Sequence, residues 1–174
     1  LYDFFYKLEN KNLQVEALKD EIEKKIVEMM KRNKMRGKFM ERFAKLLDMY
    51  NSGAHDIDQL FDDLVDLAKE LSEEEQRSVK ENLTEEELAI FDLLLKEKMN
   101  PDERERVKKT AKELLVKLKK EKLVIDWRDK EIARSGVKTT ISEILYNSLP
   151  EPTYSEKECE FKGIEVYNFV YEHY

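Results

Sequence analysis

Apolar residues recur at intervals of three and four positions along most of the chain, the spacing that places side chains on one face of an α-helix. The clearest stripe runs from Ile57 to Leu71, and a similar one runs from Val15 to Met29. Further helices are expected where the same spacing returns, at residues 1–8, 39–50, 88–95, 107–118, 141–145 and 164–171. The pattern predicts an all-α protein, an irregular multi-helix bundle of about seven to nine helices.

Polar residues indicate where several of these helices begin and end. Three pairs have the spacing of a capping box, in which side chains satisfy free main-chain N–H groups: Ser72 with Glu75, Thr84 with Glu87, and Ser155 with Glu158. Asn100 followed by Pro101 is a further helix start. The remaining expected signals are Asp56 and Asp126 as caps, Gly53 and Gly136 as helix ends, and 123–127 as an extended connector.

Composition supports this fold class and bounds the size of the protein. The chain has 174 residues, and 41% of them are hydrophobic, which is enough to build a core. Only 4 Gly and 3 Pro are present, too few for a β-sandwich or a fold with many tight turns. We expect residues 1–174 to form a single helical domain, with possible sub-halves 1–82 and 83–174. Because the chain begins at Leu1 without Met, we expect it to be a fragment of a longer protein or a processed form.

The same residues argue against several classes of site. The spacing of the four glycines allows neither a phosphate-binding loop nor a dinucleotide-binding turn. Cys159 is the one cysteine, and His55 and His173 form neither an HExxH nor an ExxH motif. The acidic cluster between Asp56 and Asp66 lacks the glycine of a calcium-binding loop and is interpreted as solvated surface. We therefore predict no catalytic, cofactor-binding or metal-binding residue.

No apolar run approaches the length of a membrane span, and no signal peptide opens the sequence. A cytoplasmic protein that does not interact with membranes is expected.

Charge is distributed unevenly, although 32 basic and 39 acidic residues give a net charge of −7. Residues 54–97 carry 4 basic and 15 acidic groups, whereas residues 98–138 carry 14 and 8. On the helix that starts at Pro101, five cations flank the apolar stripe: Arg104, Lys108, Lys112, Lys119 and Lys122. The basic region continues past the only tryptophan, with Trp127, Arg128, Lys130, Arg134 and Lys138. These ten residues are the partner-binding candidates.

Each candidate also has a structural interpretation. The stems of the cations can lie along the edge of the core with their charged ends in water. Trp127 can be a core residue instead of an interface anchor. The tyrosine stripe Tyr167, Tyr171 and Tyr174 is interpreted as the edge of the core, with a base-stacking platform as the alternative.

Five segments, in the same order along nearly the whole chain, resemble the C-terminal part of the R subunits of type I restriction enzymes. With the family's patterns in parentheses, they are Phe39–Leu47 with Tyr50–Gly53 (ERF-x-K-L…YN-x-G), Phe61–Leu71 (the LAKEL helix), Leu83–Leu94 (LTEEELAFYDLL), Leu123–Arg128 (LVLDWR) and Val170–Tyr174 (VYE-x-Y). The departures are the insertion-like Lys96–Met99 and the basic stretch from Lys31 to Lys38.

The resemblance implies that this chain is the helical C-terminal domain of a larger multidomain subunit. The parent would be an ATP-dependent type I site-specific deoxyribonuclease, using ATP and Mg²⁺, in complex with modification (methyltransferase) and specificity subunits. None of the family's catalytic motifs can be transferred to this chain, because none of their residues lie in it.

Two functions remain open. The first is a non-catalytic assembly domain that docks the motor and nuclease subunit onto the methyltransferase, meeting DNA only through the complex. The alternative is a DNA-backbone or nucleotide contact element beside the motor, which would use the basic helix face.

Overall fold

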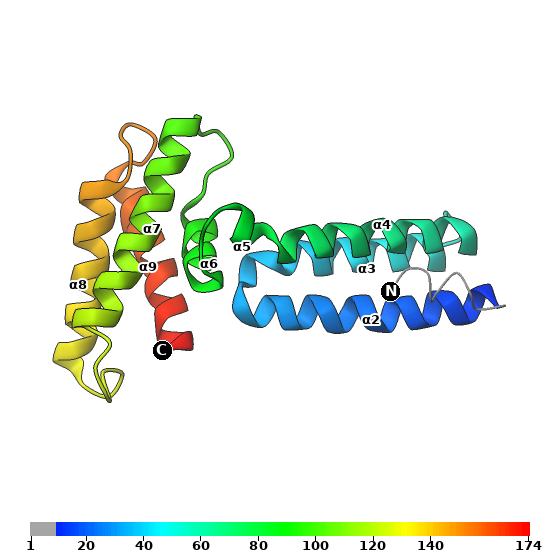
Figure 1. Cartoon of the computed structure of the whole chain (residues 1–174), viewed down its shortest axis with the longest axis horizontal. Coiled ribbons are helices and arrows are strands. Elements are labelled where there is room, and N and C mark those ends of the chain that lie inside the picture. The colour runs from blue at the N-terminus through cyan, green and yellow to red at the C-terminus, as the bar shows by residue number, and fades with distance from the viewer. Residues whose placement is uncertain (1–9) are drawn as a thin grey trace. The chain divides into compact units, whose positions relative to one another are not determined.

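A computed structural model describes residues 10–174; the helix expected at residues 1–8 lies outside the described residues. Across 10–174 the chain forms eight α-helices, one 3-10 helix (η1) and no strand, so the all-α prediction is confirmed (Figure 1). The elements are α2 (Lys11–Arg32), η1 (Lys34–Arg36), α3 (Gly37–Asn51), α4 (Ile57–Glu75), α5 (Arg77–Lys80), α6 (Glu85–Leu94), α7 (Pro101–Glu121), α8 (Glu131–Ser148) and α9 (Glu156–His173).

The chain divides into two compact units, with the division between Glu85 and Glu86. In unit 1, α4 packs against both α2 and α3, and α2 runs alongside these two helices in Figure 1. The predicted stripes meet in its core, whose fully buried members include Leu18, Ile22, Ile26, Phe61 and Leu64. Because each helix buries one apolar face, unit 1 is a bundle of amphipathic helices around a shared core.

Most local signals in unit 1 predict the observed helix ends, and one does not. Gly53 follows α3 with a φ of 77°, the left-handed conformation that favours glycine, and Asp56 forms a capping box at the start of α4. The capping box predicted at Ser72 is wrong, because Ser72 lies inside α4 and its hydroxyl donates to the carbonyl of Ala68. The apolar stripe continues through Leu71, which is fully buried, so packing extends the helix past Ser72.

A buried ion cluster ties the end of α4 to η1. The guanidinium of Arg36 donates to Glu74 at 3.1 Å and to Glu85 at 2.7 Å, and Arg77 also pairs with Glu74. The side chains of Arg36 and Glu74 are 3% and 7% exposed. Such charges need partners when water is removed, and here each has at least one.

In unit 2, α8 packs against both α7 and α9, and the three helices lie side by side in Figure 1. The core includes Leu88, Phe91, Leu114, Ile141 and Val166, all fully buried. The start signals at Asn100 and Ser155 are confirmed as capping boxes, and Pro101 is the first residue of α7. α6 begins directly after Thr84.

The expected break at Gly136 is wrong. Gly136 lies inside α8, which runs unbroken from Glu131 to Ser148 because Val137, Ile141 and Leu145 form one buried stripe. That burial outweighs the roughly 1 kcal/mol by which an internal glycine disfavours a helix. Asp126 does not cap α8 either: it has a φ of 61° in the loop before it, and Lys130 is the N-cap residue. Within residues 10–174, none of the helices combines the length and apolar character that a membrane crossing requires.

Candidate functional site

Trp127 lies at the centre of an aromatic cluster in unit 2. Its ring meets the rings of Tyr167 and Tyr171 edge-on, with centroids 6.4 and 5.8 Å apart, and its indole N–H donates to the main-chain carbonyl of Tyr174 at 3.2 Å. Only 2% of Trp127 is exposed. The loop between α7 and α8 is thereby fixed to α9, and Trp127 itself is a core residue.

Three candidate cations lie over the tyrosine rings of this cluster. Lys119 is 5.1 Å from the ring centre of Tyr174, Arg128 is 5.6 Å from that of Tyr171, and Lys138 is 4.7 Å from that of Tyr167. A cation over an aromatic face is attracted by the negative face of the ring. We call these residues the basic–aromatic face: Lys119, Trp127, Arg128, Lys138, Tyr167, Tyr171 and Tyr174.

Glu86 at the start of α6 borders this face. Burial opposes its ionisation, but the ion pair with Lys119 and the nearby hydroxyl of Tyr174 hold the pKa of Glu86 below its ordinary value. Burial and the Glu86 carboxylate raise the pKa of Tyr174. Lys119 therefore contacts both a carboxylate and an aromatic ring.

The other partner-binding candidates are not part of the basic–aromatic face. Arg104 stacks on Phe91 at 4.9 Å, and Lys108 pairs with Glu105 at 2.7 Å. Both lie towards the start of α7, roughly 15–25 Å along the helix from Lys119 at a rise of about 1.5 Å per residue. Arg134 donates to the main-chain carbonyl of Arg128, so it supports the loop. Lys112 and Lys122 are half-buried and Lys130 is exposed.

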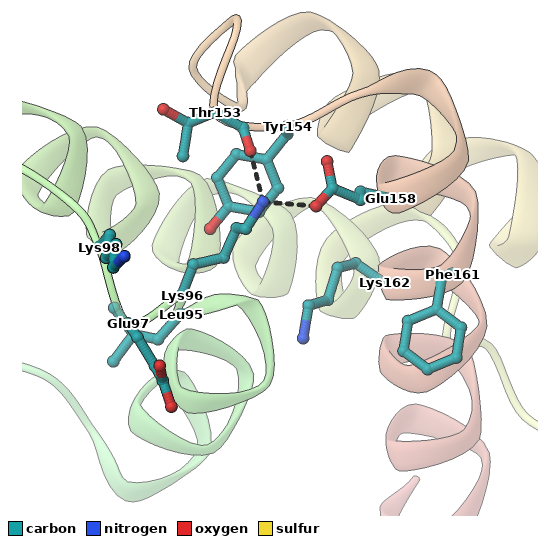
Figure 2. Close-up of a pocket in the computed structure, with 9 residues that line it drawn as sticks. All are labelled: Leu95, Lys96, Glu97, Lys98, Thr153, Tyr154, Glu158, Phe161 and Lys162. Atoms are coloured by element: carbon teal, nitrogen blue, oxygen red, sulfur yellow. Dashed lines mark hydrogen bonds and ion pairs between the residues drawn. The ribbon is translucent and has the colours of Figure 1, made fainter.

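Sequence reasoning missed a cleft of about 680 Å³ in unit 2, shown in Figure 2. Lys96, in the loop after α6, donates to the carbonyl of Thr153 at 2.6 Å and pairs with Glu158 of α9. The hydrogen bond from Lys96, together with those from Ser155, lowers the pKa of Glu158 to about 2. The hydroxyl of Tyr154 donates a hydrogen bond to the main-chain carbonyl of Leu94.

The polar groups of this cleft connect separate elements of the fold. Lys162 donates to the carbonyl of Leu93 near the end of α6 and pairs with Glu165 at 3.0 Å. Both Lys96 and Lys162 therefore fasten α6 and its following loop to α9, and no nucleophile and base lie paired among the residues that line the cleft. No local sequence signal indicates these contacts, because the partners lie about 60 residues or more apart.

Titratable residues elsewhere have structural contacts. Asp56 caps α4, Asp58 pairs with Lys11, and Asp63 lies 3.0 Å from a ring nitrogen of His55. Burial raises the pKa of the Cys159 thiol. Among residues 10–174, no group of three or more His, Cys, Asp or Glu side chains is arranged to hold a metal ion.

Most of the chain is similar to known proteins. Residues 3–160 match the family described as "Type I restriction enzyme HindI endonuclease subunit-like, C-terminal". The "Putative type I restriction enzyme MjaIXP endonuclease subunit" of Methanocaldococcus jannaschii is 30% identical over 141 residues, which cover 80% of this chain and 13% of that protein. No solved structure matches the chain.

Proposed function

The chain belongs to the family of C-terminal domains of type I restriction enzyme endonuclease subunits, and from this premise we propose that it is a non-catalytic assembly domain. In this proposal it docks the motor and nuclease subunit that carries it onto the methyltransferase of a cytoplasmic restriction complex. ATP and Mg²⁺ act in other parts of the parent subunit, and no residue of this chain is assigned to them.

The observation that carries the proposal is the basic–aromatic face. Three cations are held over aromatic rings that are themselves fixed by Trp127 and α9. Pre-positioned side chains lose little conformational freedom when a partner binds, and fixed cations attract an acidic partner over a distance. The three cations of the face belong to residues 98–138, a segment with 14 basic and 8 acidic groups in a chain of net charge −7.

The test reverses charges around this face in the full-length subunit. Lys119, Arg128 and Lys138, the three cations over the rings, are changed to Glu, and Arg134 is left intact because it supports the loop through the Arg128 carbonyl. Association with the methyltransferase is then measured as a function of ionic strength. We expect slower association at low salt and a flatter salt dependence, because long-range steering acts mainly on the association rate.

The matched control reverses three exposed lysines of unit 1, Lys34, Lys45 and Lys80, which changes the net charge by the same amount. Association that falls equally in both variants would assign the effect to overall charge and contradict the proposal. If the wild-type subunit instead binds bare DNA with a steep salt dependence that the unit 2 variant loses, the function is DNA-backbone contact.

A further inference from the structure

The outer side of α7 carries a row of cations that the basic–aromatic face does not include. From Arg106 to Lys122 the sequence holds 8 basic and 2 acidic residues. The buried apolar stripe of α7, from Val107 to Leu118, turns one side of the helix to the core, so the opposite side faces solvent. At ~100° per residue, that outer side presents five cations: Arg106, Lys109, Lys112, Lys117 and Lys120. We call these five residues the cationic face of α7.

Most of the charge on the cationic face is not neutralised by carboxylates of the chain. Lys109 lies 3.7 Å from Glu113, and Arg106 donates to the main-chain carbonyl of Ser148 at 2.7 Å. The other three cations make no ion pair with the described part of the chain: Lys112, Lys117 and Lys120. Lys120 is exposed, and Lys112 and Lys117 are half-buried. These three charges are therefore available to a partner.

The helices in contact with α7 leave this excess of positive charge in place. α8 packs against α7 and carries 2 basic and 2 acidic residues. On α6, Glu85 pairs with Arg36, and Glu86 pairs with Lys119. In the first turns of α7 itself, Glu105 pairs with Lys108. The outer side of α7 is therefore net positive, which is complementary to a polyanion.

The composition of the cationic face favours a phosphate backbone over a protein surface. Lysine is depleted in protein–protein interfaces, where aromatic, Met and Arg side chains are enriched. Four of the five cations here are Lys, and the apolar side chain that lies among them, Val116, is 60% exposed. Phosphate contacts require positive charge and no apolar surface. From Lys109 to Lys120 the helix rises about 16 Å, a length over which one DNA strand presents about five phosphates.

We infer that the cationic face of α7 is a second binding surface, which contacts the phosphates of duplex DNA without reading its sequence. DNA is the phosphate polymer chosen because the chain belongs to a family of endonuclease subunits. The surface differs from the basic–aromatic face, because Lys119 on α7 is turned towards Glu86 and Tyr174. The inference goes beyond the docking function and does not depend on it: unit 2 binds a protein through one face and DNA through the other.

The experiment measures how salt affects binding of the full-length subunit to a duplex of arbitrary sequence, without ATP. Lys112, Lys117 and Lys120 are changed to Gln, which removes three charges and keeps good helix formers. Each phosphate contact contributes about 0.9 to the slope of log K against log salt concentration. We therefore expect the slope of the variant to be shallower by about 2–3, and its affinity at ~0.1 M salt to fall about tenfold or more for every duplex sequence.

The matched control changes three exposed lysines of unit 1 to Gln, with the same loss of charge: Lys34, Lys45 and Lys80. The control is expected to keep the wild-type slope, because its cations lie outside the proposed surface. A slope that falls equally in both variants assigns the effect to net charge and overturns the inference.

Binding to the methyltransferase, measured on the same proteins without DNA, separates this inference from the docking function. The α7 variant is expected to bind the methyltransferase as the wild-type subunit does. An α7 variant that keeps the wild-type salt slope for DNA overturns the inference. If that variant also loses the methyltransferase, its cations belong to the protein-docking surface, and the docking function stands. A shallower DNA slope in a subunit that does not bind the methyltransferase supports the inference and overturns the docking function.

Discussion

At the scale of single residues, Trp127 connects the core of unit 2 with its basic face. Its ring is almost fully buried. Of its neighbours in the sequence, Asp126 is exposed and Arg128 is partly exposed. The indole contributes both apolar area and one hydrogen bond to the carbonyl of Tyr174. The same residue therefore stabilises the unit and orients the loop that we assign to docking.

Two substitutions separate these contributions. Trp127→Ala is expected to lower the free energy of unfolding by about 3–5 kcal/mol, through lost burial and the cavity left behind. Trp127→Phe keeps an aromatic ring but removes the donor to Tyr174, at a cost of about 1–3 kcal/mol. Urea denaturation followed by far-ultraviolet circular dichroism measures both values. A Trp127→Ala variant as stable as wild type would show that the ring is not part of the core.

Arg36 is a buried charged residue of unit 1 that requires ionic partners. Burial disfavours both members of its ion pair with Glu85, but the hydrogen bonds from Arg36 hold the pKa of that carboxyl below its ordinary value. Arg36→Met leaves Glu74 and Glu85 without this partner and is expected to cost about 3–5 kcal/mol. Arg42→Met, which breaks the half-exposed pair with Glu70, should cost less than about 1 kcal/mol. Similar denaturation midpoints for the two variants would contradict the buried-network account.

At the scale of elements, α8 contains an internal glycine, Gly136, whose position does not require glycine. An added Cβ at Gly136 would meet no atom within 4 Å. Gly136→Ala is therefore expected to stabilise the chain by about 0.5–1 kcal/mol. Gly53→Ala should do the opposite, because its φ of 77° is unfavourable for any residue with a side chain, at a cost of about 1–2 kcal/mol. Thermal unfolding of both variants checks the signs; a less stable Gly136→Ala protein would refute our description of α8.

The contact between the loop after α6 and α9 depends on pH. Because Lys96 and the Ser155 cap lower the pKa of Glu158 to about 2, the carboxylate stabilises the fold above its ordinary pKa, and this stabilisation is lost as the pH falls towards that lower value. The difference in melting temperature between wild type and Lys96→Met should therefore shrink as the pH is lowered from about 5 to about 2. A difference that stays constant over this range would mean that Lys96 and Glu158 are not paired in solution.

The elements also show what the sequence could and could not predict. The helix start at Asn100, the capping box at Ser155 and the stripe from Ile57 to Leu71 depend on neighbours within a few residues, so the local sequence predicts them. The predictions at Ser72 and Gly136 are wrong because tertiary burial overrides a local stop signal. The pairing of Trp127 with α9, and of Lys96 with Glu158, joins residues tens of positions apart and requires the packed topology.

At the scale of the whole molecule, the chain corresponds to a small part of the curated relative that it matches. It spans 13% of the M. jannaschii relative that it matches, so most of such a protein lies outside this domain. The alternating charge of its segments, with residues 54–97 acidic and 98–138 basic, suits a domain whose role is to meet charged partners.

The central claim is that this domain binds the methyltransferase, and a competition experiment tests it most directly. The isolated chain, first shown to be helical by circular dichroism, is titrated into a mixture of full-length subunit and methyltransferase, and the remaining complex is quantified. We expect the chain to displace the full-length subunit in a saturable way, and the charge-reversed chain (Lys119, Arg128 and Lys138 to Glu) to require higher concentrations. A helical chain that displaces nothing, even in large excess, would contradict the account.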